Sequence, residues 1–249
     1  MNADLAYSEL SEVRSAWTQP IEVHRQLPST QTCILERGPN SGVIVAVEQS
    51  GGRGRHGRAW SSPAGGLWFS LVQPTSRVDG LSLVAGLALA RVVKSLGLFP
   101  WLRWPNDVLL GAHKLAGILV DARWSGSQGH AYVGVGINVD VDPASWAEDV
   151  RPLATSLSLS GIPRPHLGHF LLQFLREWSS LSEVHSRSGL QSLHSELEQM
   201  VVGSGRNVEV HENDGEKYND RMVGLEPDGS LRLASGRQLY SVERLLVLP

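Results

Sequence analysis

The stretch Gln49-Ser-Gly-Gly-Arg-Gly-Arg-His-Gly-Arg-Ala-Trp60 sets the expectations for the whole chain. It places Arg53, Arg55 and Arg58 among four glycines. Arginine gives phosphate or carboxylate charge-assisted, two-pronged hydrogen bonds, and glycine lets a main chain come close to a ligand. Because glycine loses much conformational freedom on folding, such a loop is costly to order. We therefore predict an anion-binding loop that its ligand helps to order.

The same loop admits other interpretations. The segment Gly52 to Gly57 fits the pattern G-x-G-x-x-G after a strand-like run at 43–47, and Asp79 lies near the place of the acid in a dinucleotide fingerprint. That fingerprint needs a helix starting at the loop, whereas Pro63, two glycines and another strand follow here. A dinucleotide site is therefore disfavoured. Gly-Arg clusters also occur as flexible nucleic-acid-binding segments and as solvated turns, and the loop alone leaves these open.

Composition restricts the class of protein. The chain has 249 residues, enough for one large domain or a domain plus a small one. Its net charge of -3 argues against a general nucleic-acid binder. Cys33 is the single cysteine, so a disulfide framework and a cysteine-based metal site are excluded, and we expect a reducing, cytoplasmic compartment. We see no signal peptide and no apolar run that could span a membrane.

Strands and helices alternate through the first part of the chain. Beta-branched or apolar runs predict strands, helical spacing predicts helices, and Ser29 with Thr30 is expected to cap the first helix. The strands are expected at 21–27, 43–49, 67–73, 101–110 (broken at Pro105), 114–124 and 130–141, and the helices at 31–37 and 81–96. The last two strands read as an antiparallel hairpin. The helix at 81–96 is expected to pack on the sheet that these strands form.

The second part of the chain, from about residue 167, shows a different sequence pattern. A helix is expected at 167–181 and a shorter helical piece at 190–200. From Asn207 onward, short strands alternate with Asp-Gly and Ser-Gly turns, which indicates a small β-barrel. We therefore predict a first domain at 1–202, with its core at about 21–200, and a second domain at 203–249.

Polar residues gather at a strand break. In Arg103-Trp-Pro-Asn-Asp107, the proline removes a ladder donor, so Asn106 and Asp107 are expected at an edge, bulge or turn. Asp107 is a candidate for holding a metal ion or orienting a base. Lys114 begins an apolar strand, where it either snorkels to the edge or meets an anion. Asn138 is either a satisfied core amide or a ligand contact.

Aromatic and histidine residues give weaker signals. Trp101 and Trp104 are expected in the core, while Trp60 closes the arginine loop and is a candidate for stacking on a base. His166 and His169 lack the third ligand of a metal site, so we interpret them as a surface pair.

Four motifs, taken together, closely resemble biotin protein ligases. They follow the family's order and spacing, and they are Gly52-Arg-Gly-Arg-His-Gly-Arg-Ala-Trp60, Arg103-Trp-Pro-Asn-Asp107, Lys114-Leu-Ala-Gly-Ile118 and Gly134-Val-Gly-Ile-Asn138. The resemblance is to the short form that lacks an N-terminal DNA-binding domain. It implies an α+β fold. The catalytic domain would be a mixed sheet with flanking helices, related to class II aminoacyl-tRNA synthetases, and an SH3-like β-barrel would follow it.

The resemblance also implies two reactions. Biotin attacks the α-phosphate of ATP, with Mg²⁺, to give biotinyl-AMP and pyrophosphate. A lysine of an acceptor, the biotin carboxyl carrier protein of acetyl-CoA carboxylase or a similar carboxylase, then takes the biotin and releases AMP. Family members form homodimers through a sheet edge or remain monomers, so both states stay open.

The resemblance also implies roles for the individual residues that match the family's motifs. The resemblance implies catalytic roles for Lys114, Arg55 and Asp107. Biotin contacts are implied for Ser29, Thr30, Gln31, Gln49, Arg53, Gly54, Arg55, Lys114 and Gly117. Contacts to ATP or the adenylate are implied for Arg53, Arg55, Arg58, Trp60, Asn106, Lys114 and Asn138. No side chain is firmly assigned to a metal, since Mg²⁺ would come with ATP.

The sequence departs from the family in several places. Gln31 stands where asparagine is common, His56 where a second arginine is often found, and Tyr240 to Arg244 match the C-terminal family pattern only loosely. We expect no sequence-specific DNA binding. The rival functions are a lipoate ligase or octanoyl transferase, a non-catalytic binder of biotin or nucleotide, and a single-stranded nucleic-acid binder.

Overall fold

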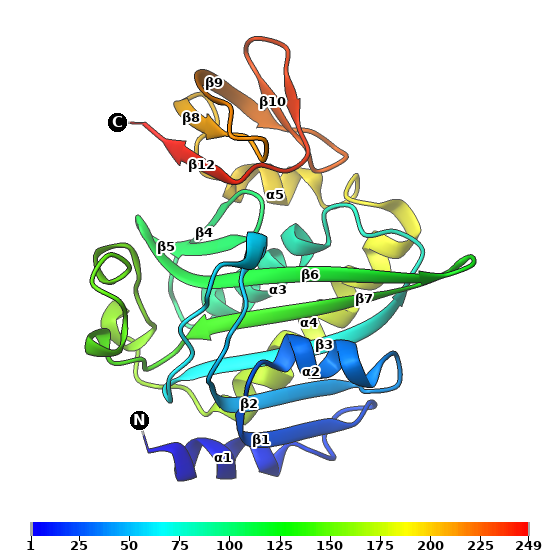
Figure 1. The fold of residues 1–249 in the computed structure, drawn as a ribbon, viewed down its shortest axis with the longest axis vertical. Helices are drawn as coiled ribbons and strands as arrows, with labels where there is room; N and C mark the ends of the chain where they lie inside the picture. Colours follow the sequence, from blue (N-terminus) through cyan, green and yellow to red (C-terminus); the bar gives the residue numbers. More distant parts are fainter. Residues whose placement is uncertain (1, 249) are drawn as a thin grey trace.

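A mixed seven-stranded sheet forms the body of the computed structural model, which describes residues 2–248 (Figure 1). Its strand order is β1-β2-β3-β7-β6-β5-β4. Only β1 and β2 pair in parallel, and the other neighbours are antiparallel. The strands are β1 (Ile21–Leu27), β2 (Val43–Gln49), β3 (Gly66–Thr75), β4 (Pro100–Arg103), β5 (Asp107–Leu110), β6 (His113–Ser125) and β7 (Gln128–Asn138). The predicted mixed-sheet α+β fold is confirmed.

Helices cover the two faces of this sheet unequally. The helices are α1 (Ala3–Glu12), α2 (Thr30–Arg37), α3 (Leu81–Ser95), α4 (Leu167–Ser188) and α5 (His194–Met200), with short 3₁₀ turns at η1 (Arg55–Gly57), η2 (Pro143–Ser145), η3 (Arg151–Leu153) and η4 (Ser158–Ser160). In Figure 1, α3 and α4 lie behind the sheet and α2 lies in front of it. The main hydrophobic core therefore fills the space behind the sheet, and the front face is free for a site.

Strand alternation separates the two faces. In β3, Leu67, Phe69 and Leu71 belong to the main core, while the residues between them point to the front. Two smaller apolar clusters cover the ends of that front face. The first is Ile34, Ile44, Val72 and Tyr132 under α2, and the second is Trp68, Val141 and Trp146.

A second sheet follows α5. It is antiparallel, with the order β11-β10-β9-β8-β12, and lies above the large sheet in Figure 1. Its strands are β8 (Asn207–His211), β9 (Lys217–Leu225), β10 (Leu231–Leu233), β11 (Gln238–Leu239) and β12 (Arg244–Val247). The division into domains at residues 202 and 203 stays a prediction. None of the helices within residues 2–248 is both long and apolar enough to cross a membrane.

Several predicted details are wrong. Trp101, expected in the core, is 43% exposed because β4 is an edge strand whose outer face meets solvent. The helical piece expected at 190–200 begins only at His194, and the strand expected to reach residue 141 ends at Asn138. Strand β3 continues through Pro74, which is tolerated because β2 pairs with β3 only from Trp68 to Leu71.

Candidate active site

The candidate site lies on the front face of the sheet, between the two small apolar clusters. Its floor is made by Gly117 on β6 and by Gly134 and Gly136 on β7, which we call the glycine strip. Gly117 pairs with Gly136, so the strip crosses two adjacent strands. Without Cβ atoms these positions leave room above the sheet for a ligand.

One end of the strip is polar and uncharged. The Thr30 N–H donates to Gln49 Oε1 (2.7 Å), and Gln49 Nε2 donates to Ser62 Oγ (2.7 Å). The hydroxyls of Thr30 and Ser70 lie 3.0 Å apart. Ser29 caps α2 through the Thr32 N–H, as predicted. The serines and threonine of this group are buried, so a ligand here would meet a fixed set of donors and acceptors.

Gln31 lies beside this group on α2. Its Nε2 donates to Asp121 Oδ2 (2.8 Å) and to the Tyr132 carbonyl (3.0 Å). Its Oε1 is buried without a hydrogen-bond partner and lies next to Gly134. The structure therefore places this residue at the strip, although the sequence left its contact in doubt.

The other end of the strip is cationic. Lys114 Nζ lies 2.6 Å from Asp107 Oδ1, and Arg103 Nη2 lies 2.7 Å from Oδ2 of the same carboxylate. Burial raises the pKa of Asp107, but Lys114 and Arg103 more than offset this, so the pKa lies below its usual value. Two cations share one carboxylate, which leaves a net positive charge for a substrate anion.

The arginine loop packs onto the C-terminal sheet. Arg55 donates to Val242 O (2.9 Å), Ser241 Oγ (3.0 Å) and Asn106 Oδ1 (3.3 Å). Burial lowers the pKa of Arg55, with Arg58 acting in the same direction and Asp107 opposing it. A guanidinium stays charged under such shifts.

The other two loop arginines are exposed. Arg58 donates to Glu243 O (3.0 Å), and Arg53 forms a backbone bridge with Ala59. The loop turns at His56, the one described non-glycine residue with positive φ (55°). The structure thus brings Arg55 to the site directly and leaves Arg53 and Arg58 at its rim.

Trp60 covers the strip from above. A Cβ added to Gly136 would lie 2.6 Å from Trp60 Nε1, and one added to Gly117 would lie 3.0 Å from the indole ring. Lys114 Nζ lies 4.9 Å from the ring centroid, within range of a cation–π contact. The indole Nε1 is buried and has no hydrogen-bond partner. A ligand lying on the strip would therefore meet or displace Trp60.

Asn106 and Asn138, which were predicted to contact the nucleotide, form hydrogen bonds within the protein. Asn106 Nδ2 donates to Ile118 O (2.8 Å) while its Oδ1 accepts from Arg55. Asn138 Nδ2 donates to Thr155 O (3.0 Å), which holds the 154–155 segment beside Lys114. These amides tie the loop and the following segment to the sheet.

Sequence reasoning missed several residues of the site. Ser70 was marked only by alternation along β3, which puts it on the front face between Trp68 and Val72. Asp121 and Ser241 carried no local signal, because they reach the site through contacts 90 and 186 residues away in the chain. Such contacts follow from the folded topology alone.

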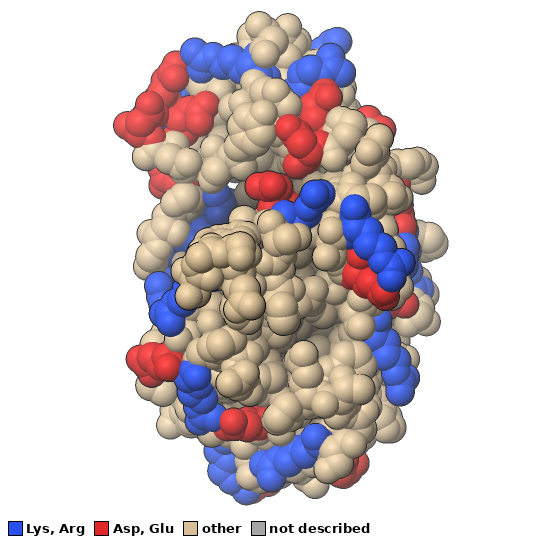
Figure 2. All heavy atoms as spheres, turned by 90° about the vertical axis from the view of Figure 1, so that its right-hand side faces the viewer, with Lys and Arg blue, Asp and Glu red and all other residues tan. Residues whose placement is uncertain are grey.

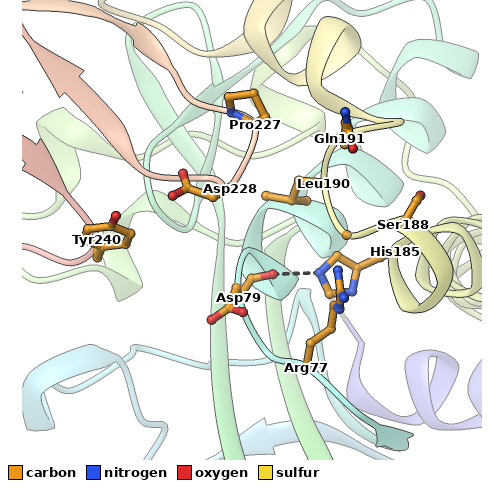
Figure 3. Close-up of a pocket in the computed structure, with 10 residues that line it drawn as sticks. Arg77, Asp79, His185, Ser188, Leu190, Gln191, Pro227, Asp228 and Tyr240 are labelled. Atoms are coloured by element: carbon orange, nitrogen blue, oxygen red, sulfur yellow. Dashed lines mark hydrogen bonds between the residues drawn. The ribbon is translucent and has the colours of Figure 1, made fainter.

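A cavity of about 620 Å³ lies elsewhere. It is drawn in Figure 3, where Arg77 and Asp79 face the turn after α4 and the loop that holds Asp228. His185 is buried there, and its Nε2 lies 2.7 Å from Asp79 O. None of the residues of the glycine strip or of the arginine loop lines this cavity, so we do not assign the predicted chemistry to it.

Comparison with known proteins identifies the family. Residues 23–138, which hold the glycine strip and the loop, match the model of the biotin/lipoate A/B protein ligase family. Residues 23–138 therefore form a domain of this family. Its relatives include the bifunctional ligase/repressor of Bacillus subtilis, 28% identical over 243 residues, which cover 90% of this chain and 73% of that protein.

Two further relatives are informative. The biotin–[acetyl-CoA-carboxylase] ligase of Mycobacterium tuberculosis is 36% identical over 178 residues, covering 66% of this chain and 64% of that one. The solved biotin protein ligase of Aquifex aeolicus, in complex with biotin and ATP, superposes with a TM-score of 0.81 at 26% identity, covering 93% of this chain and all (100%) of that one. The family member described here is therefore an enzyme of the ligase class.

Proposed function

We propose that this ligase activates biotin with ATP and transfers it to a lysine of an acceptor protein. The observation that carries the proposal is the polarity of the glycine strip. Its uncharged end, at Thr30 and Gln49, suits a ureido group, and its cationic end, at Lys114, suits a carboxylate. Biotin has these two groups at opposite ends, joined by an apolar body. The biotin and ATP bound to the Aquifex aeolicus relative support the same assignment.

In the first step, a carboxylate oxygen of biotin forms a bond to the α-phosphorus of ATP, and the bond to the pyrophosphate oxygen breaks. Both reactants are anions, so cations must bring them together. We assign this work to Lys114 at the strip and to Arg55 above it, with Arg53 and Arg58 at the rim of the loop. Their positions at the cationic end support these roles.

In the second step, the amine of the acceptor lysine attacks the mixed anhydride and AMP leaves. That lysine has a reference pKa near 10.4, so a group must accept its proton. The lowered pKa of Asp107 makes its carboxylate a weak base and a better electrostatic partner for an incoming ammonium group. We therefore propose that Asp107 orients the lysine and does not remove its proton.

The same carboxylate is a poor place for a resident metal ion. Asp107 already faces Lys114 and Arg103, whose charges oppose a divalent cation. Within residues 2–248, no group of three histidine, cysteine or acidic side chains is arranged to hold a metal. We propose that Mg²⁺ arrives bound to the triphosphate and does not rest on Asp107.

We further propose that this chain acts on a biotin carboxyl carrier protein and binds no operator DNA. On the face drawn in Figure 2, lysine and arginine are interspersed with aspartate and glutamate, unlike the continuous basic surface of a DNA binder. Sequence-specific binding in a gel-shift assay at physiological salt would contradict this part of the proposal.

The test is pyrophosphate–ATP exchange with biotin, octanoate, lipoate or no acid. We expect exchange only with biotin, followed by labelling of a biotin carrier domain and not of a lipoyl domain. Exchange that follows lipoate or octanoate would move the protein to the sister activity of its family. Absence of exchange with every acid would overturn the enzyme proposal.

A further inference from the structure

The side-chain amide of Gln31 has only one reasonable orientation. It is 3% exposed and contacts two groups that can only accept hydrogen bonds, the Asp121 carboxylate (2.8 Å) and the Tyr132 carbonyl (3.0 Å). The amide nitrogen must therefore face these acceptors. Its oxygen then faces the opposite side, where a Cβ added to Gly134 would lie 2.6 Å from Oε1.

This oxygen is an acceptor in need of a donor. Gln31 Oε1 is buried and has no hydrogen-bond partner, a costly state that native proteins usually avoid. The nearby Ser70 hydroxyl already pairs with Thr30. An N–H group of a ligand that lies over Gly134 would satisfy Oε1, and a ureido group supplies such an N–H.

We propose that Asp121 is a positioning residue for the acid substrate. By accepting from Gln31 Nε2, its carboxylate keeps Gln31 Oε1 turned toward Gly134, where it accepts from one ureido N–H of biotin. Asp121 itself lies on β6 and acts only through Gln31. The inference rests on the proposed function, because it takes biotin as the ligand of the strip.

A carboxylate is required for this role because it cannot donate. In Asp121→Asn, the new amide can donate to Gln31 Oε1, so the Tyr132 carbonyl is left as the acceptor that still opposes the reversed orientation of Gln31, and that orientation becomes populated. The Gln31 nitrogen would then face the ligand's N–H, and two donors would meet. We expect the KM for biotin in pyrophosphate exchange to rise about tenfold, since one hydrogen bond to a neutral group changes affinity by that order. The kcat and the KM for ATP should stay near wild type, and Asp121→Glu should largely preserve the biotin KM.

Two biotin analogues, each with a different ureido N–H replaced by oxygen, separate positioning from a general structural effect. Wild type should bind one of the two about tenfold more weakly than biotin, since an oxygen cannot donate to Gln31 Oε1. In Asp121→Asn, the ratio of the Kd of this analogue to the Kd of biotin should approach one. Calorimetric titration of biotin and of both analogues gives this ratio without relying on turnover.

A double-mutant cycle with Gln31→Leu tests whether Asp121 acts through Gln31. In the Gln31→Leu background, Asp121→Asn should have no further effect on the biotin KM. Asp149→Asn, an exposed aspartate outside the site, is the matched control and should behave as wild type.

The outcomes are distinguishable. An unchanged biotin KM and analogue ratio in Asp121→Asn, with biotin-dependent exchange intact, would overturn the positioning role and leave the proposed function standing. A parallel loss of kcat and melting temperature without a change in the analogue ratio would also overturn it, in favour of a structural role. Exchange that does not depend on biotin in wild type would overturn both.

Discussion

Lys114 and Asp107 form an ion pair at the cationic end of the glycine strip, with Nζ and Oδ1 2.6 Å apart. The pair is shared, since Arg103 holds the other carboxylate oxygen. Asp107 is only 12% exposed at its side chain, so its charge is stabilised by these two partners and little by water. We propose that Lys114 is the cation that turns to a substrate while Arg103 remains on Asp107.

Replacement of Lys114 by alanine should abolish most adenylation without unfolding the protein. A charge-assisted contact contributes about 1.5–3 kcal/mol, so biotin-dependent exchange should fall roughly ten- to a hundredfold. The fold should survive because Arg103 still pairs with Asp107. Lys217→Ala, an exposed lysine of β9, controls for the loss of one charge. Exchange at the wild-type rate in Lys114→Ala would refute the assigned role.

Replacement of Arg55 by alanine should make the adenylate intermediate escape faster. The change removes the hydrogen bonds from the loop to Asn106, Ser241 and Val242, so the loop is held more weakly to the segment between β11 and β12, where the bond from Arg58 to Glu243 O remains. We expect the lifetime of bound biotinyl-AMP, measured by rapid filtration, to shorten by about tenfold or more. Arg232→Ala, an exposed arginine of β10, is the control. An unchanged lifetime would count against closure of the loop over the adenylate.

Glu9 should make the free energy of unfolding depend on pH in the acid range. Its carboxylate accepts from Arg164 at 2.8 and 2.6 Å and from the Leu167 N–H at 2.9 Å, which ties α1 to the start of α4. Burial raises the pKa of Glu9, but these hydrogen bonds outweigh it, so the pKa lies below the ordinary value of 4.5. The stabilisation is therefore fully present above pH 4.5 and is lost as pH falls through the lower, folded-state pKa.

Glu9→Gln should accordingly destabilise the fold by about 1–3 kcal/mol at pH 7, measured by urea unfolding. The difference from wild type should shrink as pH falls below 4.5. Glu12→Gln, whose carboxylate is more exposed, serves as the comparison. A difference that stays constant down to acid pH would mean that Glu9 does not act through its charge.

Gly136→Ala should disturb the site by moving Trp60. The new Cβ would lie 2.6 Å from Trp60 Nε1, closer than side-chain contacts permit, so the indole must shift. Overpacking of this kind costs about 1–3 kcal/mol, and we expect roughly a tenfold rise in the Kd for biotin, measured by calorimetry. Gly224→Ala on β9, whose new Cβ would meet only the end of the Glu198 side chain, should bind biotin as wild type does. Equal affinity in Gly136→Ala and wild type would show that Trp60 does not constrain the strip.

Local patterns predicted most elements because their causes are local. The β-branched run in β2 and the spacing of leucines in α3 each indicate one type of structure whatever their surroundings. Trp101 was mispredicted for a non-local reason, since an aromatic residue in a strand is buried only if the strand has cover on that face. Nothing near Trp101 in the sequence says that β4 lies at a sheet edge.

The candidate site shows the same division. The chemical types in the arginine loop, and the placement of Asn106 and Asp107 at a strand break, follow from the sequence, because glycine, arginine and proline have strong intrinsic preferences. The partners of these residues do not follow from it. The pairing of Lys114 with Asp107 arises from the β5–β6 register, and that of Arg55 with Ser241 from packing of the C-terminal sheet on the loop.

By itself the sequence determined the family motifs, most of the strands and helices, and the glycine and arginine content of the loop, since these depend on residue type and short-range periodicity. Only the tertiary structure decided that Gln31 displays its oxygen over Gly134 and that Asp121 holds it there. The orientation of an amide depends on which acceptors the fold brings to its nitrogen, and Asp121 lies 90 residues away along the chain.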